Sequence, residues 1–178
     1  ALRAGREAVR RMEEARARLR EDPDDPLSHL ALATILLAVP PAAPTLERAE
    51  SHLQAAYEGS RSDAERAEVH REAAFRRIDT ALAQGRFGEA LARIEAALPL
   101  DPGNETGWVP RALLARGKIH LARAAGEAAR RDLVRAAERF PESAEAPEAL
   151  FYLVIAAIQG EDEAEAKRWY RRLRNGYP

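Results

Sequence analysis

The chain of 178 residues contains no cysteine, which excludes disulfides, thiolate zinc sites and cysteine nucleophiles. No apolar run approaches the roughly 20 residues that a membrane-spanning helix needs. The formal net charge at pH 7 is only −1, so no surplus of positive charge attracts nucleic acid or an anionic membrane. Aromatic and β-branched residues are scarce, whereas alanine, leucine, arginine and glutamate, which favour helices, are abundant. The composition therefore predicts a helical protein.

One pattern of small and apolar residues recurs along the chain. After the turn-like Gly85, steps of four, three and five residues connect Ala90, Ile94, Ala97 and Pro102. The same steps recur at Ala129, Leu133, Ala136 and Pro141, and again at Ala166, Tyr170, Leu173 and Pro178. The closing prolines at positions 102, 141 and 178 lie 39 and 37 residues apart. Partial copies lie upstream, at Ala49, Leu53 and Ala56, and at Ala8, Met12, Ala15 and Leu19 before Pro23.

Each stripe fits a helix that packs closely on a neighbour through small residues, and the following proline prevents the helix from continuing. A second apolar segment precedes each of the later stripes, at residues 27–39, 73–82, 112–121 and 149–158. The repeating unit is therefore helix, turn, helix, with a period near 34 residues plus short insertions. Asp25 and Pro26 are typical of a helix start, and Gln84–Gly85 and Gln159–Gly160 of the turns within pairs.

These features resemble the tetratricopeptide repeat family, whose pattern has Gly or Ala on the first helix, then Ala, an aromatic residue and Ala on the second, and then Pro. The matching residues are Gly85, Phe87, Ala90, Ala97 and Pro102 in the repeat 71–104; Gly117, Ala129, Ala136 and Pro141 in 110–143; and Ala166, Tyr170 and Pro178 in 147–178. The chain departs from the pattern at Arg77, where leucine is usual, at Trp108, just before its repeat, and at the insertion 40–44.

The resemblance covers nearly the whole chain and implies an all-α fold, a right-handed α-solenoid of about four helix pairs. We predict one domain over residues 1–178, with an N-terminal half-repeat at 1–23 and repeats at about 26–62, 71–104, 110–143 and 147–178. The stretch 140–178 also resembles repeats of bacterial cell-envelope proteins, the periplasmic and outer-membrane lipoproteins that assist assembly. That resemblance implies the periplasm or the periplasmic face of the outer membrane, with membrane attachment only through a removed N-terminal anchor. The alternative is a cytoplasmic repeat protein.

The sequence offers no constellation for chemistry, so we predict no catalytic residue, no cofactor, no metal site and no enzyme. His29, His52, His70 and His120 lie on different helical turns, and a metal ion would need three of them to converge from different repeats. We interpret them as histidines of the surface or groove edge. The GRFG sequence at 85–88 imitates the loop of single-stranded RNA-binding modules, but no strand is expected nearby, so we interpret it as a turn and predict no nucleic-acid partner.

The segment 149–158 is apolar on all sides, so it must be covered on more than one side. We expect Leu150, Leu153, Val154 and Ala157 to face neighbouring helices. In the family that the chain resembles, the first helix of each pair lines a concave groove where peptides or helices lie. The resemblance thus implies a binding lane formed by Leu30, Thr34, Phe75, Asp79, Leu114, Lys118, Phe151, Tyr152, Ile155 and Ile158. An apolar peptide or helix suits this lane; the alternative is that these residues are ordinary core.

The function that follows is a non-catalytic protein-interaction scaffold that assists assembly of a cell-envelope complex. The alternative is a cytoplasmic regulatory module of a larger signalling or sensor protein. Repeat stacks usually end in a polar capping helix, and none is visible before the last residues, 175–178. We therefore expect a continuation of the chain, or self-association through the uncapped C-terminal repeat. Trp169 and Tyr170, adjacent on the last helix, should point to different faces.

Overall fold

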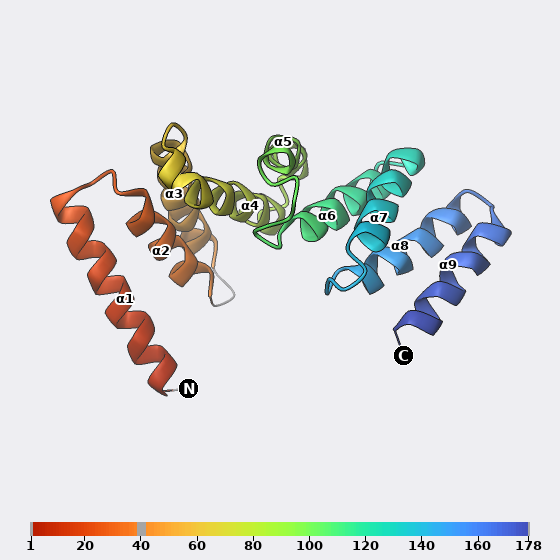
Figure 1. The fold of residues 1–178 in the computed structure, drawn as a ribbon, viewed down its shortest axis with the longest axis horizontal. Helices are drawn as coiled ribbons and strands as arrows, with labels where there is room; N and C mark the ends of the chain where they lie inside the picture. Colours follow the sequence, from red (N-terminus) through yellow and green to blue (C-terminus); the bar gives the residue numbers. More distant parts are fainter. Residues whose placement is uncertain (1, 39–41, 178) are drawn as a thin grey trace. The chain divides into compact units, whose positions relative to one another are not determined.

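The computed structural model describes residues 2–38 and 42–177 of the chain, and in these residues it contains nine α-helices, two short 3-10 helices and no strand (Figure 1). The α-helices are α1 (Leu2–Glu21), α2 (Pro26–Leu37), α3 (Ala43–Ser60), α4 (Ala67–Ala83), α5 (Phe87–Ala97), α6 (Val109–Ala122), α7 (Gly126–Arg139), α8 (Ala146–Gln159) and α9 (Glu163–Gly176). The 3-10 helices are η1 (Ala64–Arg66) and η2 (Leu98–Leu100). The predicted all-α fold class is confirmed.

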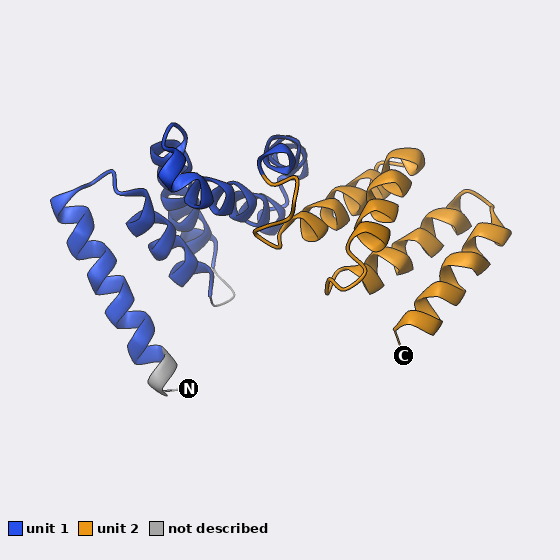
Figure 2. Ribbon diagram, in the orientation of Figure 1, with its two compact units in different colours: residues 1–100 blue, residues 101–178 orange. Residues whose placement is uncertain are grey.

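The helices pack as consecutive pairs. Helix α1 packs on α2, and the pairs are α2 with α3, α4 with α5, α6 with α7 and α8 with α9; α8 and α9 visibly run in opposite directions (Figure 1). The chain forms two compact units, residues 1–100 and residues 101–178 (Figure 2). The single domain over 1–178 stays a prediction. Pro178, expected to close the last repeat, and Pro40 and Pro41 of the insertion lie outside the described residues.

The repeated stripes form the cores of both units. The stripe residues of three repeats are all at most 1% exposed: Ala49, Leu53, Ala56, Ala90, Ile94, Ala97, Ala129, Leu133 and Ala136. Gly117 on α6 shows why small residues are needed, because a Cβ atom there would lie only 2.7 Å from two side-chain atoms of Leu133 on α7. Close approach of the helices is what buries the larger side chains completely.

The last repeat departs from the stripe. Tyr170 is the counterpart of the buried Ile94 and Leu133, yet it is 54% exposed, and the neighbouring Trp169 is buried in its place at 1% exposure. The two side chains point to different faces of α9, as predicted. No helix in the described part of the chain covers the Tyr170 side.

Two of the α-helices, α2 and α9, begin at a side-chain cap. The predicted cap of α2 is confirmed: the Asp25 carboxylate accepts hydrogen bonds from the backbone N–H of Ser28 at 3.1 Å and from its hydroxyl at 2.5 Å, and Pro26 occupies the first turn. Asp162 caps α9 in the same way by accepting from the N–H of Glu165 at 2.8 Å. These caps satisfy backbone donors that have no partner within the helix.

The turns within the last three pairs share one backbone feature. Gly85, Ala124 and Glu161 have positive φ angles of 69°, 57° and 57°, at the same 39- and 37-residue spacing as the closing prolines. The turns predicted at Gln84–Gly85 and Gln159–Gly160 are confirmed, but the left-handed residue of the last turn is Glu161. Of the stretch 85–88, interpreted as a turn, only Gly85 and Arg86 lie in the turn, and Phe87 and Gly88 begin α5. Two of the three positions therefore hold a side chain where glycine would be unstrained.

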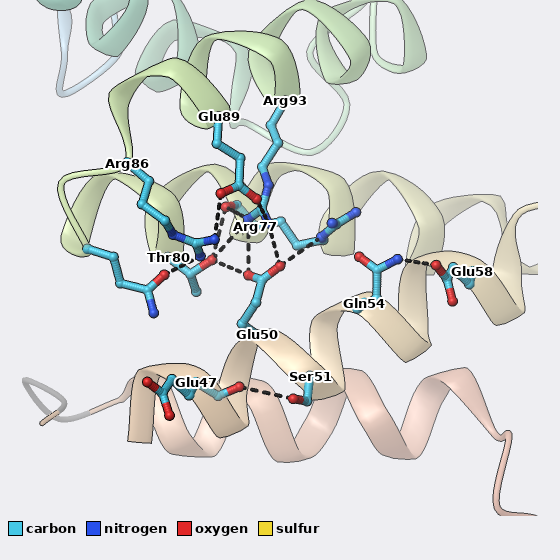
Figure 3. A network of polar contacts seen from close by, with 11 residues as sticks. Glu47, Glu50, Ser51, Gln54, Glu58, Arg77, Thr80, Arg86, Glu89 and Arg93 are labelled. Atoms are coloured by element: carbon cyan, nitrogen blue, oxygen red, sulfur yellow. Dashed lines mark hydrogen bonds and ion pairs between the residues drawn. The ribbon is translucent and has the colours of Figure 1, made fainter. Parts of the chain in front are cut away.

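A buried polar network explains the departure at Arg77. The carboxylate of Glu50 on α3 binds both terminal nitrogens of Arg93 on α5, at 2.6 and 3.0 Å, and Nε of Arg77 on α4 at 3.2 Å (Figure 3). It also accepts a hydrogen bond from the hydroxyl of Thr80. Arg93 further pairs with Glu89 and donates to the carbonyl oxygen of Arg77. Arginine replaces leucine here because it reaches a carboxylate shared by three helices.

The charge of Glu50 is maintained by this network. Burial alone would raise the pKa of Glu50, but the hydrogen bonds from Arg93 and Thr80 outweigh burial and lower the pKa below its usual value. The ionised carboxylate therefore contributes stability above the usual pKa, and this contribution is lost as the pH falls through the lowered value.

Replacing Ala124 with glycine should stabilise the protein. Ala124→Gly relieves a left-handed conformation that costs a residue with a Cβ atom about 1–2 kcal/mol, partly offset by the greater freedom of glycine in the unfolded chain, so the free energy of unfolding should rise by about 0.5–1 kcal/mol. The reverse change, Gly85→Ala, should lower it by about 1 kcal/mol through the backbone alone, since no atom lies within 4 Å of the new Cβ. Urea unfolding measures both, and changes of the same sign in the two variants would contradict the shared turn geometry.

Removing the carboxylate at the centre of the network should be costly. Glu50→Ala leaves Arg77 and Arg93 buried without their shared partner, and the free energy of unfolding should fall by about 3 kcal/mol in urea unfolding at neutral pH. Glu47→Ala, one turn earlier on α3 and exposed, is the matched control and should change it by less than about 0.5 kcal/mol. Equal losses in the two variants would show that the network contributes nothing beyond helix propensity.

Candidate partner-binding surface

Helix α8 divides its apolar residues between core and surface. Leu150, Leu153 and Ala157 are buried against the helices that pack on α8, namely α6, α7 and α9. Phe151 and Ile158 are 49% and 59% exposed. Three of the four residues predicted to face neighbouring helices are therefore buried, whereas the fourth, Val154, is only half-buried. Tyr152 and Ile155 are half-buried and lie on the same side, and we define Phe151, Tyr152, Ile155 and Ile158 as the α8 face.

One ion pair borders the α8 face. Nζ of Lys118 on α6 lies 2.8 Å from a carboxylate oxygen of Glu148 on α8 and 5.0 Å from the centroid of the Tyr152 ring. The hydrogen bond to Glu148 raises the pKa of Lys118. The ring of Phe151 meets that of Tyr152 edge-on, with centroids 5.5 Å apart. The face is therefore a fixed aromatic and aliphatic surface whose bordering charges already have partners.

The structure corrects three residues of the predicted binding lane. Leu30, Phe75 and Leu114 lie in the cores, and Phe75 is only 1% exposed. Leu30 packs in a cluster with Ala33, Leu53, Ala56, Val69 and Ala73. These three positions are ordinary core, because their alanine neighbours let the helices approach closely enough to cover a large side chain.

The other lane residues keep some access to solvent. Thr34 is half-buried, donates its hydroxyl to the carbonyl oxygen of Leu30 at 2.9 Å, and lines a cleft of about 310 Å³ between α1 and α2. Asp79 on α4 is half-buried and engaged in an interaction of its own. Within the second unit, Lys118 lies beside the α8 face, where its Nζ atom approaches the ring of Tyr152.

Two of the histidines meet, which sequence reasoning missed. His29 on α2 and His52 on α3 face each other with their Nδ1 atoms 2.9 Å apart, and Nε2 of His29 lies 2.9 Å from the carbonyl oxygen of Pro23. Because that carbonyl only accepts, Nε2 of His29 carries a proton, and in the neutral pair Nδ1 of His52 donates to Nδ1 of His29. Two fully protonated rings would place N–H against N–H, so this contact exists only while at least one ring is neutral.

The remaining histidines have separate partners. Nδ1 of His70 lies 2.9 Å from the carbonyl oxygen of Tyr57, and the two rings stack at 4.2 Å. Nε2 of His120 lies 3.9 Å from Asp132, which also forms a double hydrogen bond with Arg116. Among the described residues, no three His, Cys, Asp or Glu side chains come together in a way that could hold a metal ion.

Comparison with known proteins supports the fold class. No protein-family model and no curated protein matches the chain. The crystal structure of the apo form of RapI, a TPR-like helical repeat protein, is similar with a TM-score of 0.77 and 15% sequence identity. The likeness covers 93% of this chain and 61% of the RapI chain, so this chain spans less than two thirds of RapI. At this identity the likeness shows the fold alone: a helical repeat protein.

In the described residues, no helix combines the length and apolarity needed to cross a membrane.

The histidine pair should make stability depend on pH. Burial first, and then the neighbouring His29, Arg48 and Arg16, lower the pKa of His52, so the unfolded chain binds more protons than the folded one in this range. The free energy of unfolding should therefore be highest above the usual histidine pKa and fall between about pH 7 and pH 5. His52→Gln should flatten this slope in urea unfolding.

His70→Gln is the matched control, because it removes a histidine from the same region and leaves the pair intact. It should retain the slope between the two pH values. A slope that survives in His52→Gln would show that other groups cause it.

Proposed function

We propose that this protein is a non-catalytic scaffold that binds an apolar peptide or helix of a partner protein, with the α8 face as the centre of the contact. The observation that carries the proposal is the exposure of Phe151 and Ile158 on a helix whose opposite side is locked in the core. Large apolar side chains displayed together on a rigid element are typical of interaction sites. The helical-repeat fold is compatible with this role.

The chemistry of the border favours an apolar occupant. Lys118 and Glu148 neutralise each other beside Tyr152, so the face presents no unpaired charge that needs an opposite charge on the partner. Covering the exposed halves of Phe151 and Ile158 would contribute about 1 kcal/mol each, which is about half of the roughly 1.5–3 kcal/mol gained by burying a whole side chain of this kind. A partner segment with apolar residues at helical spacing would cover both.

We further propose that the scaffold assists assembly of a complex in the bacterial cell envelope, on the periplasmic side. The resemblance of residues 140–178 to repeats of envelope lipoproteins supports this location. The complete gene sequence tests it: a lipidation-signal cysteine just before Ala1 would support the envelope, and fusion to a kinase, protease or DNA-binding domain would refute it.

A second candidate function is a cytoplasmic regulatory module within a larger protein. The observation that favours it is that this chain corresponds to only 61% of RapI, so the same architecture occurs as part of a longer helical-repeat chain. The same gene sequence separates the two candidates.

Self-association is a further part of the proposal. Tyr170 is exposed where its counterparts in earlier repeats are buried, and a second copy covering this side of α9 would bury it. Light scattering on the purified chain tests this, and a strict monomer at high concentration would refute it.

Charge on the α8 face should weaken partner binding. The partner is first captured from native cells with the intact protein, identified by mass spectrometry and purified for titration. In the double variant Phe151→Asp and Ile158→Asp, two carboxylates would have to be desolvated on binding, so the affinity should fall at least about tenfold, ~1.4 kcal/mol. The single variant Phe151→Asp is compared with Phe87→Asp, which places one carboxylate at a phenylalanine of similar exposure on α5.

Circular dichroism and the melting temperature should show that all these variants fold like the parent. Full affinity in the double variant, or equal losses in Phe151→Asp and Phe87→Asp, would dismiss the α8 face as the binding surface.

A further inference from the structure

A second cleft lies on another part of the second unit. It has a volume of about 530 Å³ and is formed by α7, α8, α9 and the turns at residues 124–126 and 159–162. Leu153, Ala156 and Ala157 give it apolar walls, and Trp169 also lines it. None of the residues of the α8 face lines this cleft, so it is separate from the surface proposed above.

Trp169 brings an unused hydrogen-bond donor to the cleft. Its side chain is 1% exposed, yet within the described residues its indole Nε1 has no hydrogen-bond partner. The indole N–H is one of the groups that lower the pKa of the nearby Glu165 carboxylate. The distance and angle between the two groups nevertheless do not meet the criteria of a hydrogen bond. Glu165 is instead held by Arg130, at 2.9 Å from Nε and 2.8 Å from a terminal nitrogen.

A buried tryptophan N–H usually has an acceptor, and leaving it without one costs about 1–3 kcal/mol. The guanidinium of Arg168 lies over the ring, 4.3 Å from its centroid, and covers that face of the indole. A main-chain carbonyl oxygen of a bound segment would supply the acceptor that this N–H lacks.

The charges that line the cleft are mainly negative. Glu127, Asp162 and Glu165 face one cation, Arg130. The hydrogen bond with Arg130 lowers the pKa of Glu165, so this carboxylate is ionised at neutral pH. Asp162 accepts a hydrogen bond from the backbone N–H of Glu165 at the start of α9. One carboxylate balances Arg130, and two remain to attract a positive charge.

We propose that this cleft binds a basic residue of a peptide segment. The ammonium or guanidinium group lies among Glu127, Asp162 and Glu165, the aliphatic stem lies along Leu153, Ala156 and Ala157, and a main-chain carbonyl accepts the hydrogen bond of Trp169. Lysine and arginine bury their methylene groups on apolar surface in this manner while the charge stays near water. An acidic or purely apolar segment would leave the surplus carboxylates unpaired.

The experiment follows the indole signal of Trp169 by NMR in the full chain. The chain has two tryptophans, so Trp108→Phe leaves the Trp169 signal alone, and Trp169→Phe confirms the assignment. The probes are N-acetyl-lysine N-methylamide, the neutral N-acetyl-norleucine N-methylamide, which keeps the four-carbon stem without the ammonium group, and the acidic N-acetyl-glutamate N-methylamide. The lysine probe should move the Trp169 signal saturably and bind more tightly than the norleucine probe, and the glutamate probe should not bind.

A charge variant tests the electrostatic part. Glu127→Gln, at an exposed position of the first turn of α7, should weaken the lysine probe about two- to fivefold and leave the norleucine probe unchanged. Glu95→Gln, an exposed glutamate in the first unit, is the matched control and should change neither. Phe151→Asp should also leave the titration unchanged, so failure here and failure of the α8 face are distinguishable.

Two outcomes would overturn the proposal. If no probe moves the Trp169 signal, the acceptor is an ordered water molecule that peptides do not displace. If norleucine binds as tightly as lysine, or glutamate binds more tightly, the cleft does not select a basic residue.

Discussion

Close approach between paired helices is the constraint on which the rest of this structure depends. The stripe alanines and Gly117 leave room for the side chains of the facing helix, and Leu133 fills the space that a Cβ atom at Gly117 would need. Because the helices lie this close, leucine and isoleucine reach complete burial in a fold with few aromatic residues. Each helix pair is thereby a stiff element, and its outer residues are held in fixed positions.

The stiffness of α8 accounts for both surfaces proposed in the second unit. Leu153 and Ala157 pack inward beside the cleft that contains Trp169, while Phe151 and Ile158 remain outside. One helix therefore contributes residues to two surfaces of different chemistry, an apolar face and an acidic cleft. A partner that carried an apolar segment and a basic residue at suitable spacing could use both, and its affinity would then exceed that of either contact.

The periodicity of the sequence was sufficient to predict the helices, their pairing, the cap at Asp25 and the two sides of α8. It identifies which face of a helix is apolar, but it does not reveal how many neighbours cover that face. For this reason the sequence predicts groove positions for Leu30, Phe75 and Leu114, which are core residues. It also does not predict that Trp169 is buried in place of Tyr170.

Specific side-chain contacts between helices cannot be predicted from the sequence for a related reason. The pair His29 and His52 and the carboxylate of Glu50 depend on the relative rotation of facing helices, which a single sequence does not determine. The only signal was indirect: Arg77 occupies a position where the family that the chain resembles has leucine, and such a departure indicates a polar partner nearby.

The Glu50 network has a consequence for how the first unit opens. In a repeat protein each helix pair usually contacts only its neighbours, so fraying can proceed one pair at a time. Here one carboxylate on α3 is bound by arginines on both α4 and α5 (Figure 3), so neither of those helices can separate without breaking the same ionic contact. Helices α3, α4 and α5 thus form one cooperative segment that crosses the boundary between two repeats, and amide protons along all three should become accessible in a single opening event.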